Sequence, residues 1–192
     1  MTLLAACATE GAFDPLEDYE QLQHAGVVDS PAPAAGQFAP ADRDVVDRGR
    51  YLVVLLGCGA CHTNGAFEGA PDMSKALAGS RTGIAWTNPL DRRHPGIVFP
   101  ANITPDEKTG IGLLTDAQVA NAIRAGTASH GKRRLKTMPW QGYARLTDDD
   151  VDAIVAYLRA IPAIEHKVPA AVLPGRESSR PFVYFGVYRR RN

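Results

Sequence analysis

The segment Cys58-Gly59-Ala60-Cys61-His62 constrains the fold of this chain more than any other part of the sequence. Two thiols can add to the vinyl groups of a porphyrin, and the adjacent imidazole can bind its iron. If the segment is helical, residues three and four positions apart lie on one face, so all three side chains can meet one edge of a ring. Cys-x-x-Cys-His is the attachment signature of a c-type haem. The sequence therefore predicts one covalently bound haem c and an electron carrier.

A Cys-x-x-Cys pair also occurs in three haem-free settings: a dithiol redox site, half of a zinc site and a structural disulfide. No second Cys-x-x-Cys pair and no His-x3–5-His pair follows to complete a zinc site. The flanking sequence lacks the alternating strands and helices of a thioredoxin-like unit. The third cysteine, Cys7, lies far upstream in a polar, Pro/Ala-rich region. Haem attachment is the favoured hypothesis, and zinc or dithiol chemistry remains the alternative.

The length of 192 residues suits one domain with extensions. A formal net charge of zero favours neither a nucleic-acid partner nor any other polyanion. The charges are nevertheless unevenly placed. Residues 1–42 hold seven acidic and no basic side chains, whereas residues 124–145 hold six basic and no acidic ones. We therefore expect a polarised surface.

The N-terminal region raises the question of a membrane anchor. No apolar run reaches the roughly 18 residues that a membrane-spanning helix needs. Leu4-Ala5-Ala6-Cys7 resembles the lipobox of bacterial lipoproteins, whose cysteine carries the lipid, but the residues before it are too few for a signal peptide. Either the signal starts upstream or the match is accidental. Residues 8–42 have the composition of an extended tether, and a strap packed over the domain is the alternative.

The segment before the Cys58 motif has apolar residues at three- and four-residue intervals, which predicts an amphipathic helix. We expect it to start near Asp42 or Arg43 and to run directly into the motif. A glycine inside a helix costs about 1 kcal/mol relative to alanine. Gly49, in the middle of this helix, therefore indicates that another backbone packs closely against it.

The remaining chain predicts a long loop region and two short helices. Residues 63–111 are rich in glycine and proline with little periodicity, which favours loops that wrap a cofactor. Thr115 is a good N-cap for a helix over residues 116–125. Thr147 is a good N-cap for a second helix, which Pro162 ends.

The occupant of the second axial position on the iron decides the chemistry. An open position favours binding or activation of small molecules, and a filled one favours electron transfer. Met73 lies only 11 residues from His62, a short reach to the opposite face of a ring. Met138 precedes Pro139, which stiffens the loop, although Met138 could also be an ordinary core residue. The candidates in the sequence are Met73, Met138, His94, His130 and His166.

The Cys58–His62 motif, Met138-Pro139 and the helical segment Ile154-Val155-Ala156-Tyr157-Leu158 together resemble class I mono-haem c-type cytochromes. The resemblance covers roughly residues 42–162. It implies an all-α cytochrome c fold, with three to five short helices and long loops wrapped around one haem. It also implies that the first helix crosses the last where Gly49 meets Tyr157.

The same resemblance implies the site residues. Cys58 and Cys61 would form the thioethers, and His62 and Met138 would be the axial ligands. Trp140 and Tyr143 could pack on the ring near the methionine side, or could be generic core residues. A methionine ligand raises the reduction potential above that of two histidines. In such cytochromes a backbone carbonyl shortly after the motif accepts the proximal imidazole N–H, and Pro71 is the nearest candidate.

A second motif narrows the resemblance. Asn102-Ile103-Thr104-Pro105-Asp106, followed by Thr109-Gly110-Ile111-Gly112, is similar to a loop of cytochrome subunits that serve membrane-associated dehydrogenases. This similarity implies electron transfer between redox proteins, with a dehydrogenase or a terminal oxidase as partner, and no catalysis by the chain itself. The alternatives are a fixed haem subunit of such a complex, and a haem sensor or enzyme with a labile sixth ligand.

We expect three segments: a signal remnant and tether over residues 1–41, a cytochrome c domain over 42–165, and an extension over 166–192 whose aromatic run forms a strand or strap. Haem attachment implies a periplasmic location, with Cys7 as the lipid anchor if the lipobox is genuine. Several basic residues could form a rim that steers an acidic partner, or simply a solvated face. They are Arg124, Lys132, Arg133, Arg134, Lys136 and Arg145.

Overall fold

The computed structural model describes residues 17, 19–23, 26–34, 42–91, 93–126 and 137–186. Three sets of predicted features lie outside these residues: the lipobox cysteine, one candidate ligand histidine and most of the basic cluster. They are Cys7, His130, Lys132, Arg133, Arg134 and Lys136.

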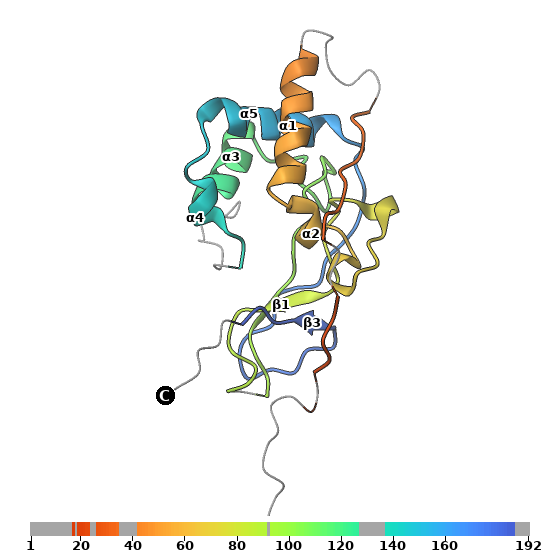
Figure 1. The fold of residues 1–192 in the computed structure, drawn as a ribbon, viewed down its shortest axis with the longest axis vertical. Coiled ribbons are helices and arrows are strands. Elements are labelled where there is room, and N and C mark those ends of the chain that lie inside the picture. The colour runs from red at the N-terminus through yellow and green to blue at the C-terminus, as the bar shows by residue number, and fades with distance from the viewer. Residues whose placement is uncertain are drawn as a thin grey trace, which may run out of the picture.

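The helices gather at one end of the molecule and a small sheet lies at the other (Figure 1). The described residues form the helices α1 (Arg43–Leu55), α2 (Cys58–His62), α3 (Asp116–Ala125), α4 (Trp140–Tyr143) and α5 (Asp148–Ala160). The predicted helical class is confirmed, with the sheet as an addition. Within the described ranges, none of these helices has the length and apolar character needed to cross a membrane.

Helices α1 and α5 form the frame of the domain, and they cross at Gly49 as predicted. A Cβ at Gly49 would overlap the carbonyl of Ala153 and lie 2.7 Å from Tyr157 Cβ. Val53 on α1 and Tyr157 on α5 have no solvent exposure. The close crossing therefore brings the apolar faces of the first and last helices into one core.

The sequence pattern predicted that the first helix runs directly into the Cys58 motif, and this prediction is wrong. It ends at Leu55, and Gly57 has a positive φ of 69° before α2 begins. This left-handed conformation favours glycine because residues with a Cβ pay a steric penalty there. The turn redirects the chain, so that Cys58, Cys61 and His62 belong to a separate short helix.

The two predicted N-caps are confirmed. Gln118 N–H donates to Thr115 Oγ1 at 3.2 Å, and Thr115 N–H donates to Gln118 Oε1 at 2.8 Å, which is a complete capping box on α3. Thr147 Oγ1 accepts from Asp150 N–H at 3.1 Å at the start of α5. Side-chain hydrogen bonds therefore fix where both helices begin.

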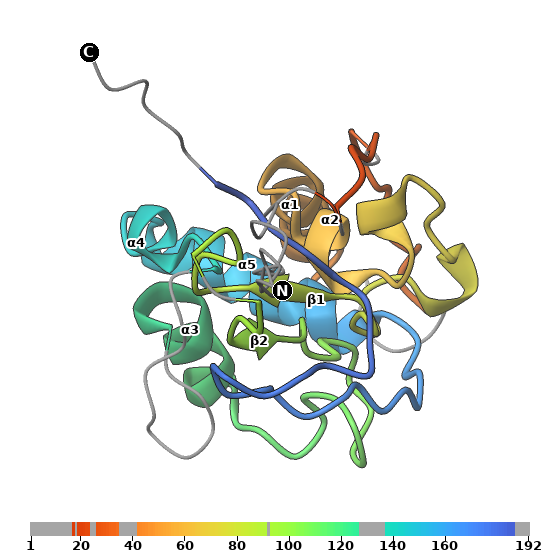
Figure 2. The same cartoon turned by 90° about the horizontal axis from the view of Figure 1, so that it is seen from below.

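The long region after α2 contains two 3-10 helices, Ala66–Glu68 and Met73–Lys75, and then β1 (Gly83–Ala85) and β2 (Ile97–Val98). The strands β1 and β2 pair antiparallel, with Ile84 opposite Val98. On its other edge β1 pairs in parallel with β3 (Phe182–Val183), which lies beside it in Figure 1. The view from below shows β1 and β2 next to each other (Figure 2). The aromatic C-terminal run thus contributes a strand.

The N-terminal segment 26–34 lies along the helical part of the molecule (Figure 1). Tyr157 Oη donates to the Pro31 carbonyl at 2.7 Å, and Ala34 N–H donates to the Ala160 carbonyl at 2.7 Å. Val28 is buried, and its Cβ would lie 3.1 Å from a Cβ placed on Gly59. The part of the N-terminal region that the structure describes therefore contacts α2 and α5 directly.

Replacing Gly49 by alanine should destabilise the protein, because the added Cβ meets the backbone of α5. Helix propensity alone would favour alanine by about 1 kcal/mol, whereas overpacking of this kind costs about 1–3 kcal/mol. We expect urea unfolding to report a net loss of stability. Gly142→Ala is the matched control, since Gly142 is also helical and its Cβ would have no neighbour within 4 Å. A Gly49→Ala variant as stable as the control would show that the crossing tolerates a wider spacing.

Burial raises the pKa of Tyr157 to about 12. The fold therefore favours the protonated phenol, and this contribution to stability is complete below the unfolded-state pKa of about 10. It should be lost as the pH rises from about 10 to about 12. In urea unfolding at a series of pH values, Tyr157→Phe should flatten this alkaline decline. Tyr51→Phe, at a position 55% exposed, is the matched control. Equal slopes in all three proteins would contradict this account.

Candidate haem-binding site

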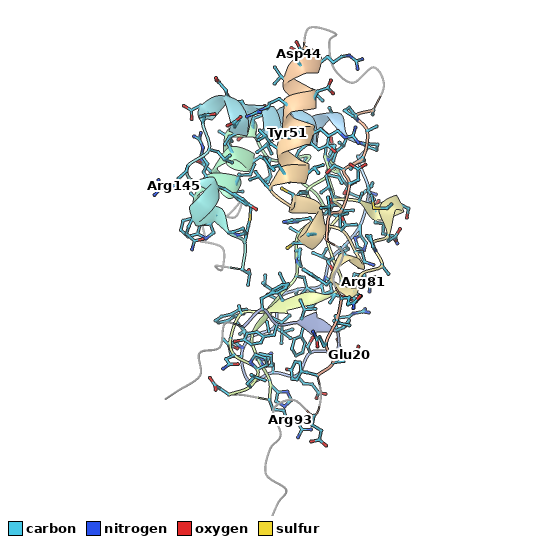
Figure 3. All side chains as sticks on the ribbon, in the orientation of Figure 1. Glu20, Asp44, Tyr51, Arg81, Arg93 and Arg145 are labelled. Atoms are coloured by element: carbon cyan, nitrogen blue, oxygen red, sulfur yellow. The ribbon has the colours of Figure 1, made fainter. Side chains whose placement is uncertain are left out.

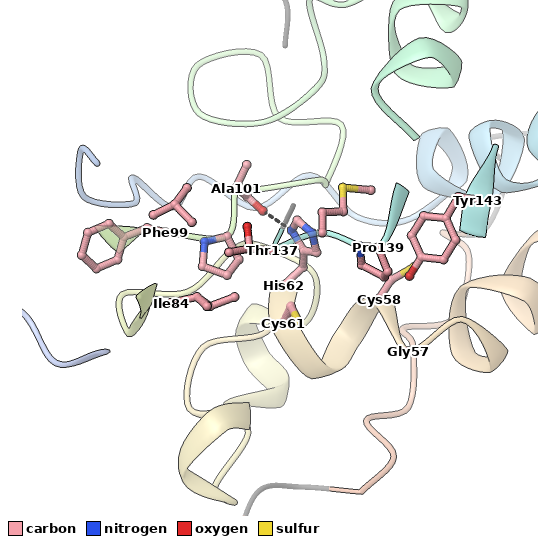
Figure 4. A pocket seen from close by; sticks show the side chains of 13 residues that line it. Gly57, Cys58, Cys61, His62, Ile84, Phe99, Ala101, Thr137, Pro139 and Tyr143 are labelled. Carbon is pink, nitrogen blue, oxygen red and sulfur yellow. Dashed lines mark hydrogen bonds between the residues drawn. The ribbon is translucent and has the colours of Figure 1, made fainter. Parts of the chain in front are cut away.

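Helix α2 forms one wall of a cavity of about 230 Å³. The opposite walls come from the sheet, from residues 98–101 and from residues 137–139 together with Tyr143. Ile84 and Val98, which face each other across the β1–β2 ladder, both line it. Figure 4 shows the side chains around this space, with Tyr143 toward one end and Phe99 toward the other. The small sheet therefore supplies part of the wall.

A second cavity of about 70 Å³ adjoins the first on the side of the helices. Apart from the residues that it shares with the first cavity, its lining is apolar and comes largely from α3 and α5, including Val119, Ile154 and Leu158. Four residues line both cavities: Cys58, His62, Met138 and Tyr143. The two spaces therefore form one apolar crevice in which these four side chains stand.

The imidazole of His62 is oriented by a hydrogen bond in which Nδ1 donates to the Ala101 carbonyl at 2.7 Å (Figure 4). A carbonyl oxygen can only accept, so Nδ1 carries the proton, which in the neutral ring leaves the lone pair on Nε2. This is the tautomer that a metal-ligating histidine needs, with its second nitrogen held by a backbone carbonyl.

The prediction that Pro71 accepts this bond is wrong. Ala101 lies 39 residues after His62, because the chain passes through β1 and β2 before it returns to α2. Nearness in sequence was the only guide to the acceptor, and it has no bearing on where a long loop folds back. No periodic pattern marks Ala101.

The two thiols are half-buried. Both cysteines are unpaired. Burial raises the pKa of Cys58 to about 12 and also raises the pKa of Cys61. Reactive dithiol sites have the opposite property, a lowered pKa beside positive groups. Among the residues that the structure describes, no group of three or more His, Cys, Asp or Glu side chains could hold a metal ion. Both findings weaken the dithiol and zinc alternatives.

The candidates for the second axial ligand are widely separated. Met138 lines both cavities beside His62. Met73 is 48% exposed and lines neither cavity. His166 Nδ1 donates to the Ala78 carbonyl at 2.9 Å, and neither His166 nor His94 lines the crevice. Of the candidates within the described residues, Met138 is the one that shares the crevice with His62.

The segment after Met138 forms α4, a helix that the sequence analysis missed. Its one turn ends at Tyr143, whose Oη donates to the Leu56 carbonyl at 3.1 Å. Burial raises the pKa of Tyr143 to about 12, which keeps the phenol a donor. Trp140 does not line the crevice; it packs against Gly126, where a Cβ would lie 2.7 Å from the indole Cδ1. Pro139, which removes a backbone donor before α4, was the available signal.

The residues of the crevice fit a haem c. They combine two thiols and an imidazole on one short helix with a thioether sulfur from a distant loop, and the surrounding side chains are mostly apolar. No Asp, Glu, Lys or Arg lines either cavity within the described residues. Such a wall suits a large, flat, mostly apolar cofactor.

The predicted basic rim is only partly visible in the described residues. Arg124 Nη1 contacts Asp148 Oδ1 at 2.5 Å, so its charge is paired. Arg145 is exposed, and its side chain lies on the outer side of the helical end (Figure 3). Steering by a basic rim therefore stays a prediction.

Comparison with known proteins gives a consistent set of relatives. The sequence profile of the family described as cytochrome c matches residues 46–162. The fructose dehydrogenase cytochrome subunit of Gluconobacter japonicus is 36% identical over 137 residues, which are 71% of this chain and 25% of that protein. The cytochrome c subunit of alcohol dehydrogenase (quinone) from Gluconobacter oxydans (strain 621H) is 36% identical over 64% of this chain and 23% of that protein.

The gluconate 2-dehydrogenase cytochrome c subunit of Pantoea cypripedii is 34% identical over 61% of this chain and 23% of that protein. This chain therefore spans about a quarter of the length of these relatives. The matched residues include most of α1, the whole of the other four helices and both sides of the crevice. The predicted resemblance to cytochrome subunits of dehydrogenases is confirmed, and the chain belongs to the cytochrome c family.

Proposed function

We propose that this chain transfers electrons through one covalently bound haem c. Cys58 and Cys61 hold the cofactor, and His62 and Met138 are its axial ligands. The observation that carries the proposal is that Met138, 76 residues after His62, borders the same apolar crevice as the Cys58–His62 helix. A haem c bound there supplies one reversible one-electron oxidation of its iron.

The side chains of the crevice determine what the site does. With both His62 and Met138 bound to the iron, no position would be open for a substrate, which favours electron transfer over small-molecule activation. The thioether of Met138 favours the reduced state relative to a second imidazole. The hydrogen bond from His62 to Ala101 favours the oxidised state instead, because it makes the imidazole a more basic ligand of the iron.

The apolar walls add to this control. Ile84, Val98 and Phe99 cover one side of the crevice, and the apolar side chains of α3 and α5 cover the other. They exclude water from the ring, and burial is one of the means by which a protein sets a haem potential. The chain's own residues thus hold, orient and desolvate the cofactor, and they catalyse no reaction on a substrate.

The relatives suggest the partner. Those reported above are cytochrome subunits of dehydrogenases. We propose that the haem accepts electrons from a dehydrogenase and passes them to a further redox protein or a terminal oxidase in the periplasm. A second candidate is a fixed haem subunit of such a complex, which the subunit names of the relatives favour. Co-purification of a dehydrogenase at stoichiometric amounts would support the fixed subunit over the diffusing carrier.

Covalent attachment can be tested directly. The full chain, exported to a bacterial periplasm with the machinery for haem c maturation, should be red and should keep its pigment when it is denatured and extracted with acidified organic solvent. The double variant Cys58→Ala, Cys61→Ala should lose the pigment, because no thioether can form. A wild-type chain that is colourless, or that releases its pigment into the solvent, would contradict the proposal.

Replacing Met138 should expose the second axial position. The wild type should show the weak far-red absorption of methionine-ligated ferric haem, and its ferrous form should not bind carbon monoxide. Met138→Ala should lose that band and bind carbon monoxide. Met73→Ala is the control, since Met73 is half exposed and outside the crevice. Wild-type protein that binds carbon monoxide would support a sensor or enzyme with a labile ligand instead.

A further inference from the structure

The loop that begins at Asn102 contains a buried polar network for which the proposed function gives no role. Asn102 is 2% exposed and Thr104 is completely buried. Burying an amide side chain is unfavourable unless its hydrogen-bonding capacity is used. Asn102 lies directly after Ala101, whose carbonyl accepts the hydrogen bond from His62.

The Asn102 amide makes four hydrogen bonds. Its Nδ2 donates to Thr109 Oγ1 at 2.9 Å and to the Ile164 carbonyl at 2.7 Å. Its Oδ1 accepts from Thr104 N–H at 2.9 Å and from Thr104 Oγ1 at 2.7 Å. These bonds use all the donors and both lone pairs of an asparagine side chain. The amide therefore joins the loop to itself and to the segment that follows α5.

The backbone on both sides of Ala101 is fixed as well. Ser80 N–H donates to the Pro100 carbonyl at 3.1 Å, and Ile103 N–H donates to the Leu77 carbonyl at 2.9 Å. In the same segment, between Leu77 and Ser80, Gly79 N–H donates to the carbonyl of His62 itself at 2.8 Å. Gly79 has a φ of 88°, and a Cβ there would lie 2.8 Å from Asn102 N, so only glycine allows this approach.

The direction of the Ala101 carbonyl is the direction of the peptide group that joins Ala101 to Asn102. The peptide groups before and after it are held by the segment 77–80, and the side chain of Asn102 is held by Thr109 and Ile164. We propose that Asn102 is a positioning residue that holds the Ala101 carbonyl on His62 Nδ1 and thereby sets the reduction potential of the haem. This inference rests on the proposed function, since it requires His62 to ligate the iron.

The expected effect has a definite sign. A firm hydrogen bond at Nδ1 raises the basicity of a ligating imidazole. A more basic imidazole stabilises the oxidised iron, so it lowers the reduction potential. Loosening the Ala101–Asn102 peptide should therefore raise the potential and should let the Nδ1 proton of His62 exchange with solvent faster. A role of Asn102 in stability alone would change neither quantity.

The test compares two perturbed variants with two controls, all as full-length haem-loaded protein. Asn102→Ala removes all four hydrogen bonds, and Thr104→Val removes the Thr104 hydroxyl while keeping the shape of the side chain. Thr104→Ser keeps the hydroxyl and should restore wild-type behaviour. Thr147→Ala removes the N-cap of α5 and lowers stability without contacting the loop.

Redox titration should give a higher midpoint potential for Asn102→Ala and Thr104→Val than for the wild type. Exchange of the His62 Nδ1 proton, measured by NMR on the reduced protein, should be about tenfold faster in both, as expected for the loss of about one net hydrogen bond. Thr104→Ser and Thr147→Ala should match the wild type in both measurements. If Asn102→Ala fails to fold, Thr104→Val and Thr104→Ser decide the question.

Wild-type potential and exchange in Asn102→Ala and Thr104→Val, with a lowered unfolding temperature, would overturn this inference and leave Asn102 a purely structural residue. The same preparations separate that result from failure of the proposed function. Covalently bound pigment in every variant shows that the cytochrome assignment stands, whereas a colourless wild type shows that it does not.

Discussion

The hydrogen bond from His62 Nδ1 to the Ala101 carbonyl joins helix α2 to a segment that returns 39 residues later. Between these two points the chain forms both 3-10 helices and the strands β1 and β2, which line the crevice on the side of the sheet. Because the imidazole, the acceptor carbonyl and Ile84 all belong to this excursion, the contact fixes the histidine and the wall opposite it together. A second bond, from Gly79 N–H to the carbonyl of His62 at 2.8 Å, ties the motif to the same excursion.

The other side of the crevice depends on a second set of contacts. The crossing of α1 and α5 at Gly49 and Tyr157 builds the core from which α3 and α5 face the cavity. Tyr143 then connects the loop that carries Met138 to the Leu56 carbonyl, at the end of α1 and next to the motif. The thioether and the imidazole thus reach one crevice independently. The loop that carries the thioether is fixed just before the start of α2, at Leu56, and the imidazole is fixed at the end of α2, by Ala101.

Local signals in the sequence predicted the parts of this structure that local chemistry controls. The Cys58–His62 motif, the N-caps Thr115 and Thr147 and the close crossing at Gly49 all follow from residue type and spacing, and the structure places each as expected. Residue type and spacing did not predict the Gly57 turn, the strand pairing or the Ala101 carbonyl as the acceptor for His62. They depend on where loops of low periodicity fold back, which is decided by packing between distant segments. The Asn102 motif indicated a resemblance but not its hydrogen bonds, because its partners at Thr109 and Ile164 are brought to it by the fold.

The two sides of the crevice differ in how firmly they are held. On the histidine side, the backbone on both flanks of Ala101 is hydrogen-bonded, and a fully bonded buried amide follows it. On the methionine side, the single turn of α4 is held by the Tyr143 hydroxyl and by Trp140 packed on Gly126. A partly exposed side-chain contact resists displacement less than a buried network in which every group is paired. Under the proposed ligation by His62 and Met138, the imidazole would therefore be the more firmly positioned of the two ligands.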